Sequence, residues 1–81
     1  MIKLYKNNLP LKEFFSVYNS IEYLQSLLSS LNEPTIVFSG LLNISFELNN
    51  ENYEMNFLTE KQTQQVVKWI DSFVYERPAN L

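Results

Sequence analysis

Hydrophobic and polar residues alternate most regularly between Leu42 and Leu58, on either side of the polar stretch 49–52. Alternation with a period of two is typical of strands with one buried face, and an Asn-rich stretch between them is typical of a turn. We therefore expect a hairpin whose inward residues pair across the two strands. The expected inward pairs are Leu48–Tyr53, Phe46–Met55 and Ile44–Phe57. On the outward face, this register places Glu47 directly opposite Glu54.

Two further segments have the composition of strands. Residues 35–39 are mostly β-branched and aromatic and are followed by Gly40, so they predict a strand that turns into the hairpin and completes an antiparallel meander over 35–58. Residues 2–5 alternate briefly between apolar and polar side chains, which predicts an additional strand at an edge of the sheet.

The apolar residues between positions 11 and 31 have helical spacing, but they do not stay on one side of a single straight helix. We expect a break near residues 19–20, because Asn19 followed by Glu22 has the spacing of a helix cap. This segment is therefore predicted to form a short helical piece before the break and a longer helix after it.

A C-terminal helix is predicted over residues 60–76. Thr59 and Gln62 form a capping-box pattern at its start, and Arg77–Pro78 end it. Its predicted buried stripe consists of Val66, Val67, Ile70, Phe73 and Val74. Together these elements predict a single α+β domain over 1–81, in which both helices cover the apolar face of a three- to four-stranded antiparallel sheet.

Composition argues against several classes of function. The chain has no Cys and no His, which removes disulfides, thiolate chemistry and histidine catalysis, and it has no Gly-rich phosphate loop. The net charge of −3 and the scattered basic residues argue against nucleic-acid binding. An apolar run of membrane-spanning length is also missing. We therefore expect a cytoplasmic protein that is not an enzyme and that binds no cofactor, nucleic acid or membrane.

The polar face of the hairpin is the main candidate for binding a protein partner with a basic surface. Two carboxylates placed opposite each other repel, and basic groups of a partner would relieve that repulsion. A solvated face whose glutamates splay apart and a hard-cation site are the alternatives, although the small number of carboxylates argues against a metal. The candidate partner-binding residues are Glu47, Glu54, Asn43 and Asn56, together with Glu51, Tyr53 and Glu60.

Displaced apolar residues near the N-terminus form a candidate oligomer interface. Leu11, Phe14, Phe15 and Tyr18 lie on a different side of the predicted helix from the later leucines. They could pack within the domain after the break, or they could pair two copies of the chain in a homodimer. Strand pairing through residues 2–5 at the sheet edge would offer a second route to a dimer.

These features favour a small acidic protein-binding module that inhibits a larger protein by covering one of its surfaces. A host nuclease or defence complex would be a suitable target, and an anti-CRISPR role fits this description. Ten Asn residues and a single Gly indicate AT-rich coding, which suits a phage or mobile element of a low-G+C bacterium. An immunity protein or antitoxin that neutralises a cognate toxin, and a self-associating assembly subunit, are the alternative functions.

Overall fold

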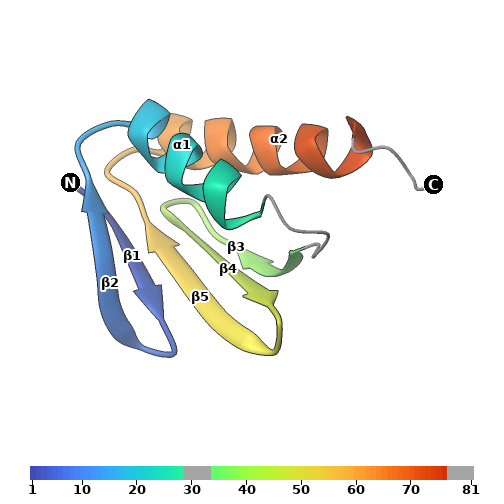
Figure 1. Cartoon of the computed structure of the whole chain (residues 1–81). Helices are drawn as coiled ribbons and strands as arrows, with labels where there is room; N and C mark the ends of the chain where they lie inside the picture. Colours follow the sequence, from blue (N-terminus) through green and yellow to red (C-terminus); the bar gives the residue numbers. More distant parts are fainter. Residues whose placement is uncertain (29–33, 77–81) are drawn as a thin grey trace.

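The computed structural model describes residues 1–28 and 34–76, with the side chains of 1–28 and 34–72. Its elements are β1 (Ile2–Lys6), β2 (Leu9–Phe14), α1 (Val17–Leu27), β3 (Thr35–Ser39), β4 (Asn43–Leu48), β5 (Glu51–Asn56) and α2 (Glu60–Glu76). The strands form one antiparallel sheet in the order β2-β1-β5-β4-β3, and both helices lie on the same side of it (Figure 1). The predicted α+β class is confirmed, but the sheet has five strands instead of three or four.

The β1–β2 and β4–β5 hairpins each close with a two-residue Asn-Asn turn. Asn7, Asn8, Asn49 and Asn50 all have positive φ angles, between 51° and 68°, as a type I′ turn requires. Asn tolerates this left-handed conformation better than most residues, and the turn matches the twist of the strands.

The tighter turn shifts the predicted register of the β4–β5 hairpin by two residues. Glu47 lies opposite Asn52 and Glu54 lies opposite Ser45, so the prediction that these glutamates face each other was wrong. Because a shift of two residues keeps every side chain on its own face, the predicted inward and outward faces are still correct.

The strand predicted at residues 2–5 is present as β1, but it lies inside the sheet between β2 and β5. Its neighbour β2 occupies residues 9–14, part of which was predicted to be helical. An extra residue, Leu11, interrupts the pairing of β2 with β1. This bulge breaks the period-two alternation of β2, so its apolar residues imitated the spacing of a helix.

Helix α1 begins earlier than predicted and continues through the expected break. Ser16 is its N-cap, and the Ser16 hydroxyl accepts a hydrogen bond from the backbone N–H of Asn19 at 3.2 Å. Ser20 is buried, and its hydroxyl donates a hydrogen bond to the carbonyl of Val17 at 2.7 Å. The buried hydroxyl therefore has a partner within the helix. The helix ends at Leu27, and the predicted extension as far as residue 31 falls partly outside the described residues.

Helix α2 occupies the predicted range, and its cap is the one that the sequence indicated. The backbone N–H of Gln62 donates to Thr59 Oγ1 at 3.2 Å, while the Gln62 side chain accepts from the N–H of Leu58 at 3.0 Å. Val66 and Ile70 of the predicted stripe are buried and Val67 is partly buried, whereas the side chains of Phe73 and Val74 lie outside the described set.

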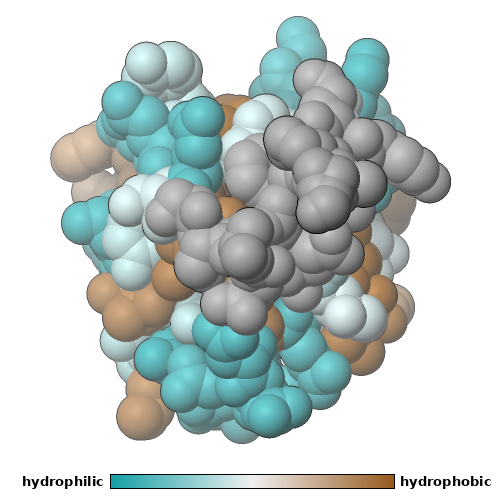
Figure 2. All heavy atoms as spheres, turned by 45° about the vertical axis from the view of Figure 1, so that its right-hand side comes forward, coloured by the Kyte–Doolittle hydropathy of each residue, from teal (hydrophilic) through white to brown (hydrophobic). Residues whose placement is uncertain are grey.

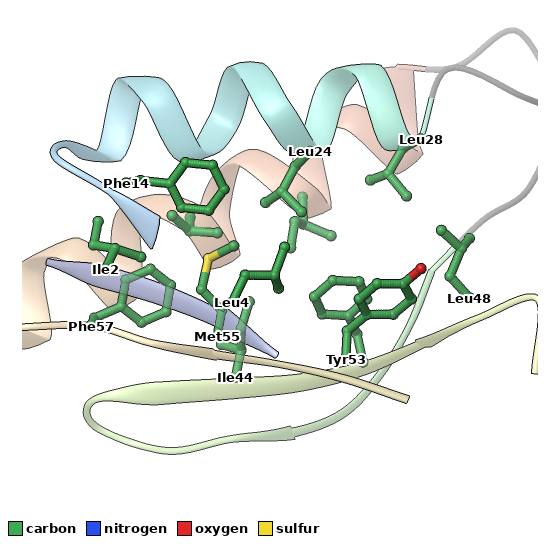
Figure 3. Packing of buried hydrophobic residues seen from close by; sticks show 13 residues of the cluster. Ile2, Leu4, Phe14, Leu24, Leu28, Ile44, Leu48, Tyr53, Met55 and Phe57 are labelled. Atoms are coloured by element: carbon green, nitrogen blue, oxygen red, sulfur yellow. The ribbon is translucent and has the colours of Figure 1, made fainter. Parts of the chain in front are cut away.

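The core lies between the sheet and the two helices (Figure 3). Phe46 and Tyr53 stack within it with ring centroids 5.1 Å apart, and Leu24 of α1 and Val66 of α2 cover the same side of the sheet. Both helices are therefore used to bury the inner face. The outer face of the sheet carries neither of them (Figure 1). In the described residues, no helix is long and apolar enough to span a membrane.

Candidate functional site

The outer face of the sheet displays polar side chains at its centre. Ladder pairing places Asn43 opposite Asn56, Ser45 opposite Glu54, and Glu47 opposite Asn52. These six residues alternate with the buried residues of β4 and β5, so they point away from the helices. The sheet centre therefore carries two carboxylates, three amides and a hydroxyl.

Neither carboxylate at the centre of this face faces another carboxylate across a strand. Glu54 lies between Ser45 and Tyr5, and Glu47 lies between Asn52 and Thr35. The direct repulsion expected from the sequence is therefore absent. Among the residues that the structure describes, neither glutamate has a salt bridge, and no group of three or more acidic, Cys or His side chains could hold a metal ion.

Two strand irregularities add apolar side chains to the edges of the outer face. On β3 the register shifts between Ile36 and Phe38, so Val37 and Phe38 together oppose the outward residue Ser45. Val37 is 60% exposed and Phe38 is 56% exposed, so these two neighbouring apolar side chains form a small apolar surface at the edge of the sheet. At the opposite edge, the bulge of β2 leaves Leu11 exposed beside Tyr5.

Sequence reasoning did not include Val37 and Phe38 in the candidate site. The available signal was the run of apolar residues in 35–39, which lacks the strict alternation of a strand with one buried face. In an edge strand, such a run either is covered on both faces or exposes apolar side chains on one of them. Here it exposes them.

A hollow of about 230 Å³ lies on the outer face beside Val37. Its polar walls come from Asn8, Ser45, Asn52 and Glu54. Phe46 and Tyr53, a cross-strand pair whose side chains face the core, complete the lining. In the described part of the chain, no hydrogen bond or ion pair engages the side chains of the four polar residues.

Three of the predicted partner-binding residues lie away from the outer face. Tyr53 is only 5% exposed and belongs to the core, because its side chain points toward the helices. Glu51 closes the β4–β5 turn and forms an ion pair with Lys6, with the Glu51 Oε2 and Lys6 Nζ atoms 2.8 Å apart. Glu60 is the first residue of α2 and lines a separate hollow between this helix and the β3–β4 turn.

Lys6, Glu51 and Tyr53 form a small polar cluster where β1 meets β5. The Tyr53 hydroxyl donates to Glu51 Oε2 at 3.4 Å, and Lys6 Nζ lies 6.0 Å from the centroid of the Tyr53 ring. Burial raises the pKa of Tyr53, an effect that the nearby Lys6 ammonium partly offsets. The hydrogen bond to the Glu51 carboxylate raises the pKa of Lys6.

Raising the pH above about 10, the ordinary pKa of tyrosine, is expected to destabilise the fold. Both Tyr53 and Lys6 have folded-state pKa values above their unfolded values, so the folded state holds their protons more tightly. The resulting stabilisation is complete below the unfolded pKa values and is lost as the pH rises through the folded ones. Melting temperatures measured from neutral to alkaline pH test this. Tyr53→Phe should show a smaller alkaline decrease, and an unchanged decrease would contradict this assignment.

The four residues of the predicted oligomer interface do not share one surface. Phe14 is buried in the core, where its ring lies 5.5 Å from that of Tyr23, while Leu11 lies at the β2 edge. Phe15 and Tyr18 are exposed near the start of α1. The predicted dimer through residues 2–5 is excluded in the form proposed, because β1 is paired on both edges.

Exposed apolar residues are distributed rather than concentrated. Figure 2 turns the right-hand side of Figure 1 forward, and its coloured residues show hydrophobic patches separated by hydrophilic ones. On the outer sheet face, the apolar residues likewise border a polar centre.

Comparisons with protein-family models, with curated proteins and with solved structures found no match for this chain.

Proposed function

We propose that this protein is a binding module that covers a basic surface of a larger protein with the outer face of its sheet, and thereby inhibits it. The observation that carries the proposal is the arrangement around Ser45. Two glutamates without salt bridges to described residues, Glu47 and Glu54, lie beside the exposed apolar pair Val37 and Phe38. This combination provides both apolar contact and charge recognition.

Charge on the outer face supports a basic partner. Glu13, Glu47 and Glu54 lie on this face with one basic residue, Lys3, which sits opposite Glu13 across β1 and β2. Neither glutamate of β4 and β5 has a basic residue directly opposite it in the described sheet; Lys3 lies opposite Asn56, diagonally across from Glu54, without a salt bridge to it. Complementary charge accelerates association and disfavours acidic partners.

The apolar pair supports an interface with a fixed geometry. A few large side chains usually contribute most of the binding energy, and aromatic residues are frequent among them. Phe38 is held by the β3 bulge next to the polar centre, so its ring can enter a pocket of the target while Glu47 and Glu54 meet basic groups around it.

The dimensions of the protein suit inhibition by coverage. A standard protein interface buries about 800 Å² on each partner. That is about 15% of the 5384 Å² accessible surface of this chain, so an interface of ordinary size would use a small part of its surface. A host nuclease or defence complex, whose nucleic-acid-binding surface is basic, is the type of target that we favour.

Capture of the target from a lysate of the natural host, followed by affinity measurements with the purified target, tests the proposal. Phe38→Ala is expected to weaken binding by about tenfold or more. Phe15→Ala is the matched control, because it removes an equally large exposed ring that lies beside Asn19 and Glu22 of α1, and it should bind like the wild type. If Phe15→Ala alone weakened binding, the site would lie at the start of α1. A toxin as the captured target would instead support an immunity function.

A further inference from the structure

We propose that the hollow beside Val37 receives one basic side chain of the target, and that arginine fits it better than lysine. This inference rests on the proposed function, because it specifies the chemistry of the same surface. The hollow has a volume of about 230 Å³ and lies between β3 and the tip of the β1–β2 hairpin. It is therefore sized for a single side chain rather than for a larger ligand.

The lining of the hollow is suited to a cation with an apolar stem. Val37 forms an apolar wall that the methylene groups of a basic side chain can cover. Glu54 supplies a carboxylate for the charged end. Ser45, Asn8 and Asn52 add hydroxyl and amide oxygens as further acceptors. The flat guanidinium of arginine carries five N–H donors in a fixed arrangement, so it can use these acceptors together, whereas lysine has three donors on one nitrogen.

Other ligand classes fit this lining less well. No basic side chain is among the described residues that line the hollow, so an anion would meet Glu54 without a counter-charge. A divalent cation normally takes about six or more oxygen ligands, and Glu54 is the one carboxylate that lines the hollow. An apolar ligand would leave four polar side chains without solvent or partner.

Three other hollows of the described structure already contain basic groups. Lys12 lines the hollow beside Glu22 at the start of α1, and Lys68 lines the one beside Asp71 on α2. Lys3 and Lys12 line a third hollow, on β1 and β2. Of these four hollows, the one at Glu54 has a carboxylate in its described lining but no basic side chain. Its carboxylate is therefore available to a cation from another molecule.

Nuclear magnetic resonance titration with N-acetyl-arginine amide tests this inference without the target. At constant ionic strength, we expect saturable shifts of the backbone amides of Ser45, Asn52 and Glu54, and a weaker response to N-acetyl-lysine amide. Glu54→Gln should weaken arginine binding by about tenfold, since it removes the charge from the strongest hydrogen bonds. Glu60→Gln is the matched control and should leave the titration unchanged, because Glu60 lines a different hollow.

Shifts that fail to saturate, or that are the same in Glu54→Gln, would overturn the assignment of the hollow. The spectrum of the free variant confirms that it remains folded, because a folded sheet keeps its dispersed amide signals. The result is separable from that for the proposed function. If arginine did not bind but target binding still depended on Phe38, only the assignment of the hollow would be rejected. If arginine bound saturably but target binding did not depend on Phe38, the proposed interface would be rejected.

Discussion

Replacing Phe46 with alanine is expected to lower the free energy of unfolding by about 3–5 kcal/mol. Phe46 is 1% exposed, comes from the penultimate strand β4, and stacks on Tyr53 beneath the helices. Its removal would leave a cavity between the sheet and the helices that neighbouring side chains can fill only in part. A domain of 81 residues has a total stability of roughly 4–12 kcal/mol, so this change would remove a large fraction of it. Urea denaturation followed by circular dichroism measures the loss.

Phe15→Ala provides the control for this prediction. It deletes the same side chain at a position that is 80% exposed, so the expected change is within about 0.5 kcal/mol. Equal losses from the two variants would show that the core does not lie where the structure places it. A loss of stability in Phe46→Ala alone would support the packing of both helices on one face of the sheet. That packing is what leaves the outer face open to a partner.

The elements with unbroken patterns could be predicted from the sequence. The alternation through β4 and β5 assigned each side chain to its correct face, and the Thr59–Gln62 pattern located the start of α2. Both signals lie within one short stretch of sequence, so they require no knowledge of neighbouring elements. The register of the hairpin was not predictable in the same way, because the pattern is equally satisfied after a shift of two residues. The Asn-Asn turn made that choice, through its left-handed backbone.

The bulged strands were the main source of error. An extra residue in β2 destroyed its alternation, and the first strand consequently lacked its partner and was assigned to an edge. The sequence pattern predicted the cap at Asn19, which has Glu22 three residues later, whereas the observed N-cap is Ser16, just after β2. Since the strand had not been recognised, the helix was started at the wrong cap.

The candidate site was predicted in part, for a related reason. The sequence indicated which glutamates point outward from β4 and β5, but not which residues lie beside them on neighbouring strands. Sheet order supplies that information, and it replaced an expected repulsive pair with two separate carboxylates. It also brought Val37 and Asn8 to the same hollow, although they are distant in the sequence. Long-range pairing of this kind leaves little trace in a single sequence.

Reversing the charge of both Glu47 and Glu54 with lysine is expected to weaken target binding by about 100-fold or more. Each change replaces an attraction to basic groups with a repulsion, and like charges placed together at an interface cost several kcal/mol. Glu47 is exposed and Glu54 is partly exposed on the outer face, and neither has a salt bridge within the described residues, so the fold should tolerate both changes. Titration calorimetry with the purified target measures the loss, and weaker wild-type binding at high salt should accompany it.

The matched control for this variant is Glu22→Lys with Asp71→Lys. Both double variants change the net charge from −3 to +1, because each substitution adds two positive charges. Glu22 and Asp71 are exposed on the helices, which lie on the opposite side of the sheet from the outer face. Similar losses in both variants would mean that only overall charge matters and that the outer face is not the site. A loss specific to Glu47 and Glu54 would locate recognition on the surface of β4 and β5, because net charge is equal in the two proteins and only its position differs.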